Sequence, residues 1–281
     1  MWKTKTPILC LLIAAAISAK PSSSATDTFV YGGCSQLKFS PASAYESNLN
    51  SLLSSLVSSA ALGRFANFTV PGGGSTVYGL FQCRGDLDAG ACSACVSRAV
   101  SQLGNICLDA CGGVLQLEGC LVRYDNVSFL GAEDKTLVLK KCGPNIGFDG
   151  QDVLTRRDDV VGSLGSSGGS YRVGGTGDVQ GVAQCVGDLS PSECQDCLSE
   201  ATGRLRSDCP MAKSADVYLA KCYARYHSGD SGSSGGGTDK DKDQDVEKTL
   251  AIIIGIVTLT ILLVIFLSFI GKQCRKLQDG K

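Results

Sequence analysis

Apolar side chains recur at helical spacing in four stretches of the chain. In the first stretch, residues 47–62, the stripe at i, i+3, i+4 and i+7 consists of Leu49, Leu52, Leu53, Leu56, Val57 and Ala60. A weaker stripe further along consists of Val153, Val160, Val161 and Leu164. The other two stripes are Cys95, Val96, Ala99, Val100 and Leu103, and then Cys197, Leu198, Ala201 and Leu205. Each stripe predicts an amphipathic helix.

Runs of alternating or β-rich composition lie between and after these helices. They are "TVYGLFQC" (76–83), "GVLQLEGCLVRYD" (113–125), "KTLVLKKC" (135–142) and "DVYLAKCYARY" (216–226). Such runs predict strands. Pairs of helices with short strands between them favour an α+β fold, with two helices on a small antiparallel sheet, over a β-sandwich.

Both ends of the chain carry apolar segments. The run Pro7–Ile17 follows Lys3 and Lys5, which predicts a signal peptide (residues 1–25) cleaved after Ser18 or Ala25. Near the other end, Leu250–Ile270 is 21 residues without a charge. At 1.5 Å per residue this run measures about 30 Å, so it predicts a transmembrane helix at 249–270.

The flanks of the predicted transmembrane helix set its orientation. Lys272, Arg275 and Lys276 follow it, and positive charge favours the cytosolic side. We therefore expect a type I protein, with residues 26–249 outside and a tail at 271–281. The Gly/Ser-rich and Asp/Lys-rich residues 229–248 predict a flexible stalk.

Charge and cysteine content narrow the class of protein. The 26 basic and 27 acidic residues give a net charge of −1, so no basic field points to nucleic acid as a partner. The chain has 15 cysteines, and in an oxidising secretory lumen we expect those of the ectodomain to form disulfides.

The cysteines reveal an internal repeat, visible in "QCRGDLDAGACSACVSRA" (82–99) and "QCVGDLSPSECQDCLSEA" (184–201). Steps of 9, 3, 12 and 13 residues separate Cys83, Cys92, Cys95, Cys107 and Cys120, and the same steps separate Cys185, Cys194, Cys197, Cys209 and Cys222. Cys34 and Cys142 lie upstream of the two sets. The spacing predicts two tandem modules, 26–141 and 142–228.

Each module contains a C-x-x-C motif just before a predicted helix. Such a motif can bind zinc, exchange disulfides or pin a fold. No second knuckle completes a zinc site, and neither zinc nor redox chemistry accounts for the other equally spaced cysteines. We favour structural disulfides, although six cysteines allow 15 connectivities. Cys111 is left over, and we expect it to be unpaired within the chain, as a free thiol or in an intermolecular disulfide.

The C-x8-C-x2-C spacing is similar to that of the ginkbilobin-type (stress-antifungal, or DUF26) domain of plants. Two such modules, the twin "GDL" motifs, "CLVRYDN", "CYARY" and the tail "GKQCRKLQDGK" resemble the plasmodesmata-located protein family. Its ectodomain is related to those of cysteine-rich receptor-like kinases. The resemblance implies two helices on a five-stranded antiparallel sheet in each module. It implies the pairs Cys34–Cys107, Cys83–Cys92, Cys95–Cys120, Cys142–Cys209, Cys185–Cys194 and Cys197–Cys222.

The resemblance also implies positions for a mannose site. They are Ser35, Val114 and Asp125 in the first module, and Gly143, Asp216 and His227 in the second. Only Asp125 is chemically similar to the family's mannose ligands, so mannose is not expected, while other glycans stay open. His227 is the only histidine, and we interpret it as a surface residue. We predict no catalytic residue, metal or cofactor.

Three positions are candidates for modification. The sequons at Asn67 and Asn126 predict N-glycosylation, and Asn67, expected in a loop after the first helix, is the better acceptor. Cys274, close to the predicted membrane boundary, is either S-acylated or a reduced thiol.

The predicted cytosolic tail, residues 271–281, is too short for a kinase domain, so the function is expected to be binding. The resemblance implies a non-enzymatic adaptor or receptor in the plasma membrane at plasmodesmata. Such a protein restricts cell-to-cell trafficking, promotes callose deposition and acts in defence. Implied partners are the membrane, other membrane or wall proteins, homo- or hetero-oligomers of the family, and viral movement proteins. The alternative is a cell-surface lectin or sensor of cell-wall glycan.

Overall fold

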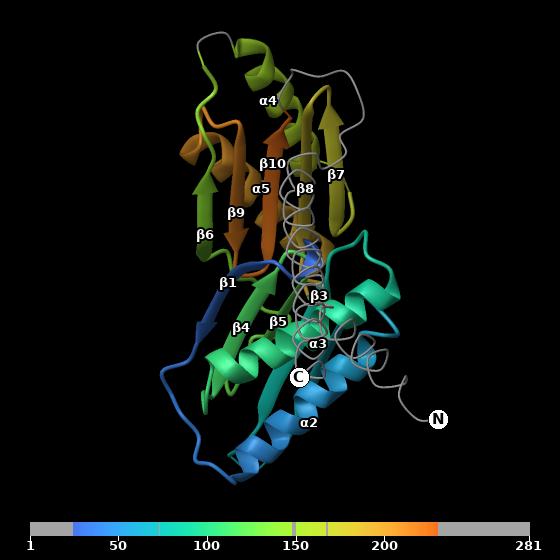
Figure 1. Ribbon diagram of the computed structural model, residues 1–281, viewed down its shortest axis with the longest axis vertical. Helices are drawn as coiled ribbons and strands as arrows, with labels where there is room; N and C mark the ends of the chain where they lie inside the picture. Colours follow the sequence, from blue (N-terminus) through green and yellow to red (C-terminus); the bar gives the residue numbers. More distant parts are fainter. Residues whose placement is uncertain (1–24, 73, 148–149, 167, 230–281) are drawn as a thin grey trace, which may run out of the picture. The chain divides into compact units, whose positions relative to one another are not determined.

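The computed structural model describes residues 25–72, 74–147, 150–166 and 168–229. They form two copies of one α+β unit, each a five-stranded antiparallel sheet with two helices, which confirms the expected fold class (Figure 1). The predicted signal peptide up to Ser24, the stalk after Gly229, the transmembrane helix and the tail lie outside the described residues. Within the described ranges, no helix combines the length and apolar character needed to cross a bilayer.

The first module begins with a short 3₁₀ helix, η1 (Ala25–Asp27). Its strands are β1 (Phe29–Cys34), β2 (Phe65–Val70), β3 (Val77–Cys83), β4 (Gly112–Leu117) and β5 (Cys120–Asp125). Its helices are α2 (Ala44–Ser59) and α3 (Ala89–Ile106). The strands lie in the order β1-β4-β5-β3-β2, and every neighbouring pair is antiparallel.

The second module repeats this arrangement. Its strands are β6 (Leu137–Cys142), β7 (Tyr171–Thr176), β8 (Val179–Cys185), β9 (Ser214–Leu219) and β10 (Cys222–Ser228). Its helices are α4 (Gln151–Ser166) and α5 (Pro191–Asp208). The order β6-β9-β10-β8-β7 matches the first sheet strand for strand, and both β1 and β6 carry a bulge near their start.

The border between the modules lies earlier than the cysteine spacing suggested. Strand β6 pairs with β9 of the second sheet, so a border after residue 141 would cut β6 one residue before its end. The first cysteine of each module stands at the end of its first strand: Cys34 is the last residue of β1, and Cys142 is the last residue of β6. A border drawn at the first cysteine therefore leaves the strand before it in the wrong module.

The C-x-x-C motifs lie inside helices rather than before them. Helix α3 begins at Ala89, because the side chain of Asp88 caps it by accepting a hydrogen bond from the backbone of Ala91. Helix α5 begins at Pro191, after a capping box formed by Ser190 and Glu193. Both helices therefore start six residues before the first residue of the corresponding apolar stripe.

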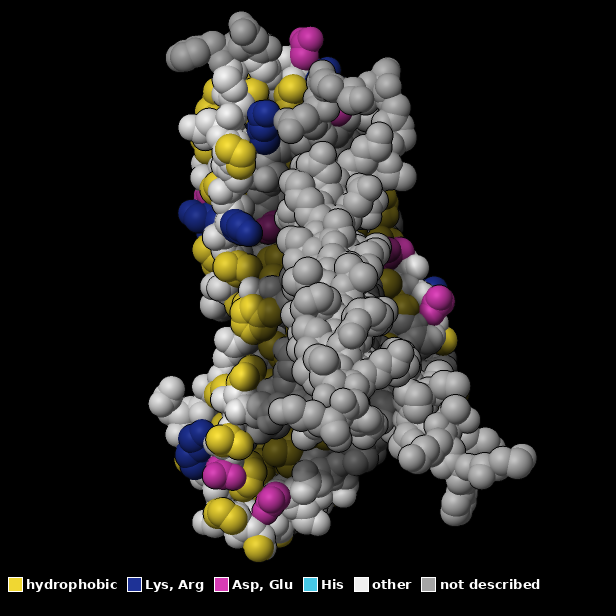
Figure 2. All heavy atoms as spheres, in the orientation of Figure 1, with side chains coloured by type: hydrophobic (Ala, Val, Ile, Leu, Met, Phe, Trp, Pro, Cys, Tyr) yellow, Lys and Arg dark blue, Asp and Glu magenta, His cyan; other side chains and the backbone are white. Residues whose placement is uncertain are grey.

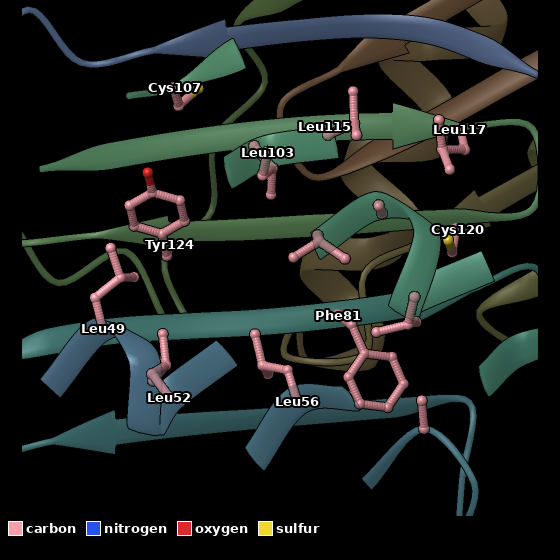
Figure 3. Packing of buried hydrophobic residues seen from close by; sticks show 14 of the residues in the cluster. Leu49, Leu52, Leu56, Phe81, Leu103, Cys107, Leu115, Leu117, Cys120 and Tyr124 are labelled. Atoms are coloured by element: carbon pink, nitrogen blue, oxygen red, sulfur yellow. The ribbon is translucent and has the colours of Figure 1, made fainter. Parts of the chain in front are cut away.

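The predicted stripes pack on one face of each sheet. Figure 3 shows the first core, in which Leu49, Leu52 and Leu56 of α2 follow the sheet, with Leu49 toward Tyr124 of β5 and Leu56 toward Phe81 of β3. Glycine at position 79 of β3 allows this close approach, since a Cβ there would collide with Leu52. Gly181 has the same role in the second module, where a Cβ would lie 2.8 Å from Cδ1 of Leu164.

Six disulfides hold helices and strands together. They join Cys34–Cys107, Cys83–Cys92, Cys95–Cys120, Cys142–Cys209, Cys185–Cys194 and Cys197–Cys222, the same six pairs that the family resemblance implies. The two cysteines of each C-x-x-C have different partners, so neither motif is a redox pair. With every one of these thiols oxidised, neither motif has a thiolate to offer zinc. The motif is a structural pin in both modules.

Candidate functional site

The two "GDL" motifs meet where the modules contact each other, a region we call the seam. The backbone N–H of Gly187 donates a hydrogen bond to the side-chain oxygen of Gln82, at 2.8 Å. Reciprocally, the N–H of Gly85 donates to the side-chain oxygen of Gln184, at 3.3 Å. Each module thus offers a glutamine from the end of a central strand and a glycine from the turn after it. The repeated motif therefore joins the modules.

Both glycines are required by close approach of an aromatic ring. A Cβ at position 187 would lie 2.7 Å from Cγ of Phe65, the first residue of β2. A Cβ at position 85 would collide with the ring of Tyr171, the first residue of β7. The turn of each module therefore packs directly against the edge strand of the other.

A buried cluster of tyrosines and charges continues the seam. The rings of Tyr31 and Tyr218 meet edge to face with centroids 5.7 Å apart, and Tyr218 stacks on Tyr223 at 5.1 Å. Burial raises the pKa of Tyr31 to about 12. Arg225 binds Glu118 of the first module and lies 3.0 Å from Asp216 of its own. Burial raises the pKa of the Asp216 carboxyl, because the cost of desolvating its charge exceeds the attraction of Arg225.

A second set of contacts fastens the loop after β5 to the second module. Lys221 forms an ion pair with Asp188, and their side chains are only 3% and 2% exposed. Lys221 also donates to the carbonyl of Phe129 at 2.9 Å, and Asp188 accepts from the N–H of Gly131 at 2.9 Å. The other carboxylate oxygen of Asp188 is buried, with no hydrogen-bond partner among the described residues. Sequence reasoning missed this ion pair.

The sheet faces that the helices leave uncovered carry two clefts. The first cleft brings together the three positions of the first module that the resemblance linked to mannose, Ser35, Val114 and Asp125. Arg123 and Tyr124 also line it. Its floor therefore combines one cation, one anion and a hydroxyl group with the side chain of Val114.

The positions that the resemblance linked to mannose in the second module make other contacts. Asp216 is bound to Arg225. A Cβ at Gly143 would collide with the side chain of Ser214, so no larger residue fits there without a shift. His227 is exposed at the end of β10, as predicted. These three positions do not form a free polar site.

The second cleft lies on the uncovered face of β7, β8 and β10, which are neighbours in the second sheet (Figure 1). Residues from both modules line it: Arg84, Asp86 and Glu118 from the first, and Tyr171, Val173, Gln180, Val182, Arg225 and His227 from the second. Arg84 and Asp86 are paired at 2.7 Å, and Arg225 is paired with Glu118. Because its charges are paired, the second cleft favours a neutral ligand.

Exposed apolar side chains mark another candidate contact surface. They include Phe29 of β1 and Leu137 and Val138 of β6, the two edge strands that correspond in the modules. In Figure 2, hydrophobic side chains (yellow) run down the left side of the face shown. Such side chains on edge strands are typical of protein contact surfaces.

The described residues offer little that would support catalysis. They contain no group of three or more His, Cys, Asp or Glu side chains that could hold a metal ion. Cys111 is free, as predicted, but it is buried, with 6% exposed. Burial raises the pKa of its thiol, which is the opposite of what an activated nucleophile needs.

Comparison with known proteins identifies the family. Residues 33–127 and 150–229 match the family described as salt stress response/antifungal. The chain is 60% identical over 300 residues to plasmodesmata-located protein 5 of Arabidopsis thaliana, covering 100% of this chain and 99% of that protein. The chain belongs to the plasmodesmata-located protein family.

Other plasmodesmata-located proteins support this assignment. Plasmodesmata-located protein 6 of Arabidopsis thaliana is 56% identical over 292 residues, with 100% of both chains covered. The crystal structure of the tandem DUF26 ectodomain of the Arabidopsis thaliana cysteine-rich receptor-like protein PDLP5 is 62% identical. It aligns with a TM-score of 0.70, covering 72% of this chain and 100% of that one. The tandem fold is therefore that of a plasmodesmata-located protein ectodomain.

The predicted modification sites of this plasmodesmata-located protein fall in different places. Asn67 lies in strand β2, not in a loop, because β2 begins at Phe65, soon after α2 ends at Ser59. Its side chain is exposed on this edge strand, so it stays a candidate for glycosylation. Asn126 is half-buried directly after β5. Cys274 lies outside the described residues. Glycosylation and S-acylation stay predictions.

Proposed function

We propose that this chain is a non-enzymatic, receptor-like membrane protein of plasmodesmata that restricts cell-to-cell trafficking. The observation that carries the proposal is the 60% identity to plasmodesmata-located protein 5 along the whole chain. In the proposed arrangement the disulfide-linked ectodomain faces the cell wall, and residues 249–270 anchor it. Callose deposition, a role in defence and docking of viral movement proteins are finer parts of the same proposal.

The test is expression of the full chain in leaf epidermis with a fluorescent protein at its C-terminus. We expect puncta at cell–cell walls that coincide with callose staining, and a shorter spread of a free fluorescent protein from single transformed cells. An even distribution over the plasma membrane with unchanged spread would refute the proposal. The matched control replaces Leu250–Ile270 by a Leu/Ala span of equal length and keeps Lys272, Arg275 and Lys276.

A cell-surface lectin or cell-wall glycan sensor is the second candidate. The first cleft favours it, since Ser35, Arg123 and Asp125 line it with hydrogen-bond donors and acceptors. Binding of the detergent-solubilised full chain to an array of cell-wall oligosaccharides tests this function. Loss of any such binding in Asp125→Ala would assign it to the first cleft.

A further inference from the structure

The uncovered face of the first sheet is occupied by an aromatic side chain of its own chain. Phe129, in the loop after β5, is 8% exposed and packs with Leu80, Leu121 and Val186 in one buried cluster. The guanidinium of Arg123 lies 4.2 Å from the centre of its ring. The Lys221 and Asp188 contacts described above fix the backbone at the carbonyl of Phe129 and at the N–H of Gly131. Phe129 therefore fills a site made by both modules.

The second cleft lies at the equivalent place on the second sheet. Arg123 pairs with Leu80 across β5 and β3, and Arg225 pairs with Val182 at the equivalent register across β10 and β8. Three further residues of the second cleft occupy positions equivalent to residues around Phe129: Tyr171 (for Phe65), Arg84 (for Val186) and Asp86 (for Asp188). The backbone framework around Phe129 is thus repeated, with the charged Arg84 in place of the apolar Val186.

Among the residues that the structure describes, none takes the place of Phe129 at this repeated site. The position equivalent to Phe129 is Ser231, and after Tyr226 the next Phe, Tyr or Trp is Phe266, inside the predicted transmembrane helix. Val173 on the floor of the second cleft is 68% exposed. The second cleft therefore presents Val182 and the guanidinium of Arg225 without the aromatic residue that covers Leu80 and Arg123, their equivalents in the first module. Val173, at the position of the exposed Asn67, extends this apolar surface.

We propose that the second cleft binds an aromatic side chain carried by an extended peptide segment of a partner protein. The ring covers Val173 and Val182 and stacks on the guanidinium of Arg225, which Glu118 and Asp216 hold in place. Two residues further along the peptide, a backbone N–H donates to Asp86, as Gly131 donates to Asp188. The paired charges of the cleft match a peptide segment that is neutral.

A peptide copied from the chain itself is the matched probe. The capped hexapeptide Asn-Val-Ser-Phe-Leu-Gly reproduces residues 126–131, and the same peptide with alanine for phenylalanine is its control. Both carry a fluorescent label, and binding to the full chain in detergent micelles is followed by anisotropy. We expect saturable binding of the phenylalanine peptide and at least a tenfold weaker affinity for the alanine peptide. Equal affinity for both, or no saturable binding, overturns the proposal.

Substitutions on the protein locate the binding. Val173→Glu puts a carboxylate on the exposed floor and should weaken binding at least tenfold, and His227→Glu at the end of the cleft should weaken it severalfold. Leu62→Glu alters an apolar side chain that is 89% exposed outside the cleft, and should change nothing. Wild-type affinity in both cleft variants overturns the proposal. Binding of cellohexaose that Val173→Glu abolishes, without peptide binding, would assign the cleft to glycan instead.

Discussion

The backbone N–H of Gly187 lies 2.8 Å from the side-chain oxygen of Gln82, 105 positions earlier in the chain. This contact and its counterpart between Gly85 and Gln184 explain why the "GDL" motif occurs twice. The motif closes a tight turn in its own module, and the turn then binds the other module. Stability of the seam and of the modules is therefore expected to be coupled.

Gly187→Ala should destabilise the protein. Its Cβ would lie 2.7 Å from Phe65, so the ring must move, and such overpacking costs about 1–3 kcal/mol. Thermal unfolding measures the loss. Gly203→Ala in α5 is the matched control, because nothing lies within 4 Å of its Cβ. There alanine should stabilise the helix by about 0.5–1 kcal/mol. Equal effects of the two substitutions would contradict a close-packed seam.

Arg172 is expected to be essential for the end of α4. Its buried guanidinium donates to the carbonyls of Leu164, Gly165 and Gly169 and to the side chain of Gln195. Arg172→Met removes the donor for the carbonyls of Leu164 and Gly169, while the carbonyl of Gly165 keeps the hydrogen bond from Gln195. The substitution should lower the free energy of unfolding by about 3 kcal/mol. Arg204→Met removes only a surface pair and should cost about 0.5 kcal/mol. Denaturant titration distinguishes the two, and similar losses would refute the capping role.

Cys95→Ala should impair export. The substitution leaves Cys120 unpaired and removes the link between α3 and β5, at a cost of about 2–5 kcal/mol. We expect retention in the endoplasmic reticulum, read from N-glycans that stay sensitive to endoglycosidase H, together with a lower melting temperature. Cys197→Ala, at the equivalent position, should behave alike. Normal export with an unchanged melting temperature would show that this disulfide is dispensable.

The thiol of Cys111 should stay unreactive in the folded protein and should not link two chains. It lies under Tyr45, whose hydroxyl donates to the Cys111 carbonyl, and burial raises the pKa of the thiol. An intermolecular disulfide, left open by the sequence, would require this side chain to emerge. Under non-reducing conditions we expect no covalent dimer, and Ellman's reagent should react only after denaturant is added. Rapid reaction of the native protein would contradict this.

The protein should lose stability at alkaline pH. Burial raises the pKa of Tyr31 and of Tyr124 to about 12, and also raises the pKa of Tyr223. In each case the folded-state pKa lies above the unfolded value of about 10. The stabilisation is therefore complete below pH 10 and is lost as the pH rises toward 12. Absorbance at 295 nm and circular dichroism should change together in this range. Tyrosine ionisation without unfolding would refute the linkage.

The architecture could be predicted from the sequence because its signals are local or periodic. The stripe of Leu49, Leu52 and Leu56 defines α2, and equal cysteine steps define the modules. The starts of α3 and α5 are determined by the capping residues Asp88 and Ser190, which do not belong to the apolar stripes. Contacts between modules carry no such signal. Lys221 and Phe129 are 92 positions apart, and nothing in either segment indicates that they meet.

The candidate site was predictable only in part. The resemblance brought Ser35, Val114 and Asp125 into one hypothesis, and the structure places all three in the first cleft. The second cleft was not foreseen, because its walls come from both modules and depend on how the turn of one meets the sheet of the other. Asn67 was misplaced because β2 follows α2 after a short connection rather than a long loop.

The reciprocal hydrogen bonds between Gln82 and Gly187 and between Gln184 and Gly85 bear on the evolutionary origin of the chain. An interface in which each half presents the same donor and the same acceptor is isologous, the kind that joins two identical subunits about a twofold axis. The chain thus has the form of a homodimer fused into one polypeptide. In a true homodimer every substitution appears on both sides at once, whereas fusion lets the halves change separately. Val186 could then cover Phe129 while Arg84, its counterpart, borders an open cleft.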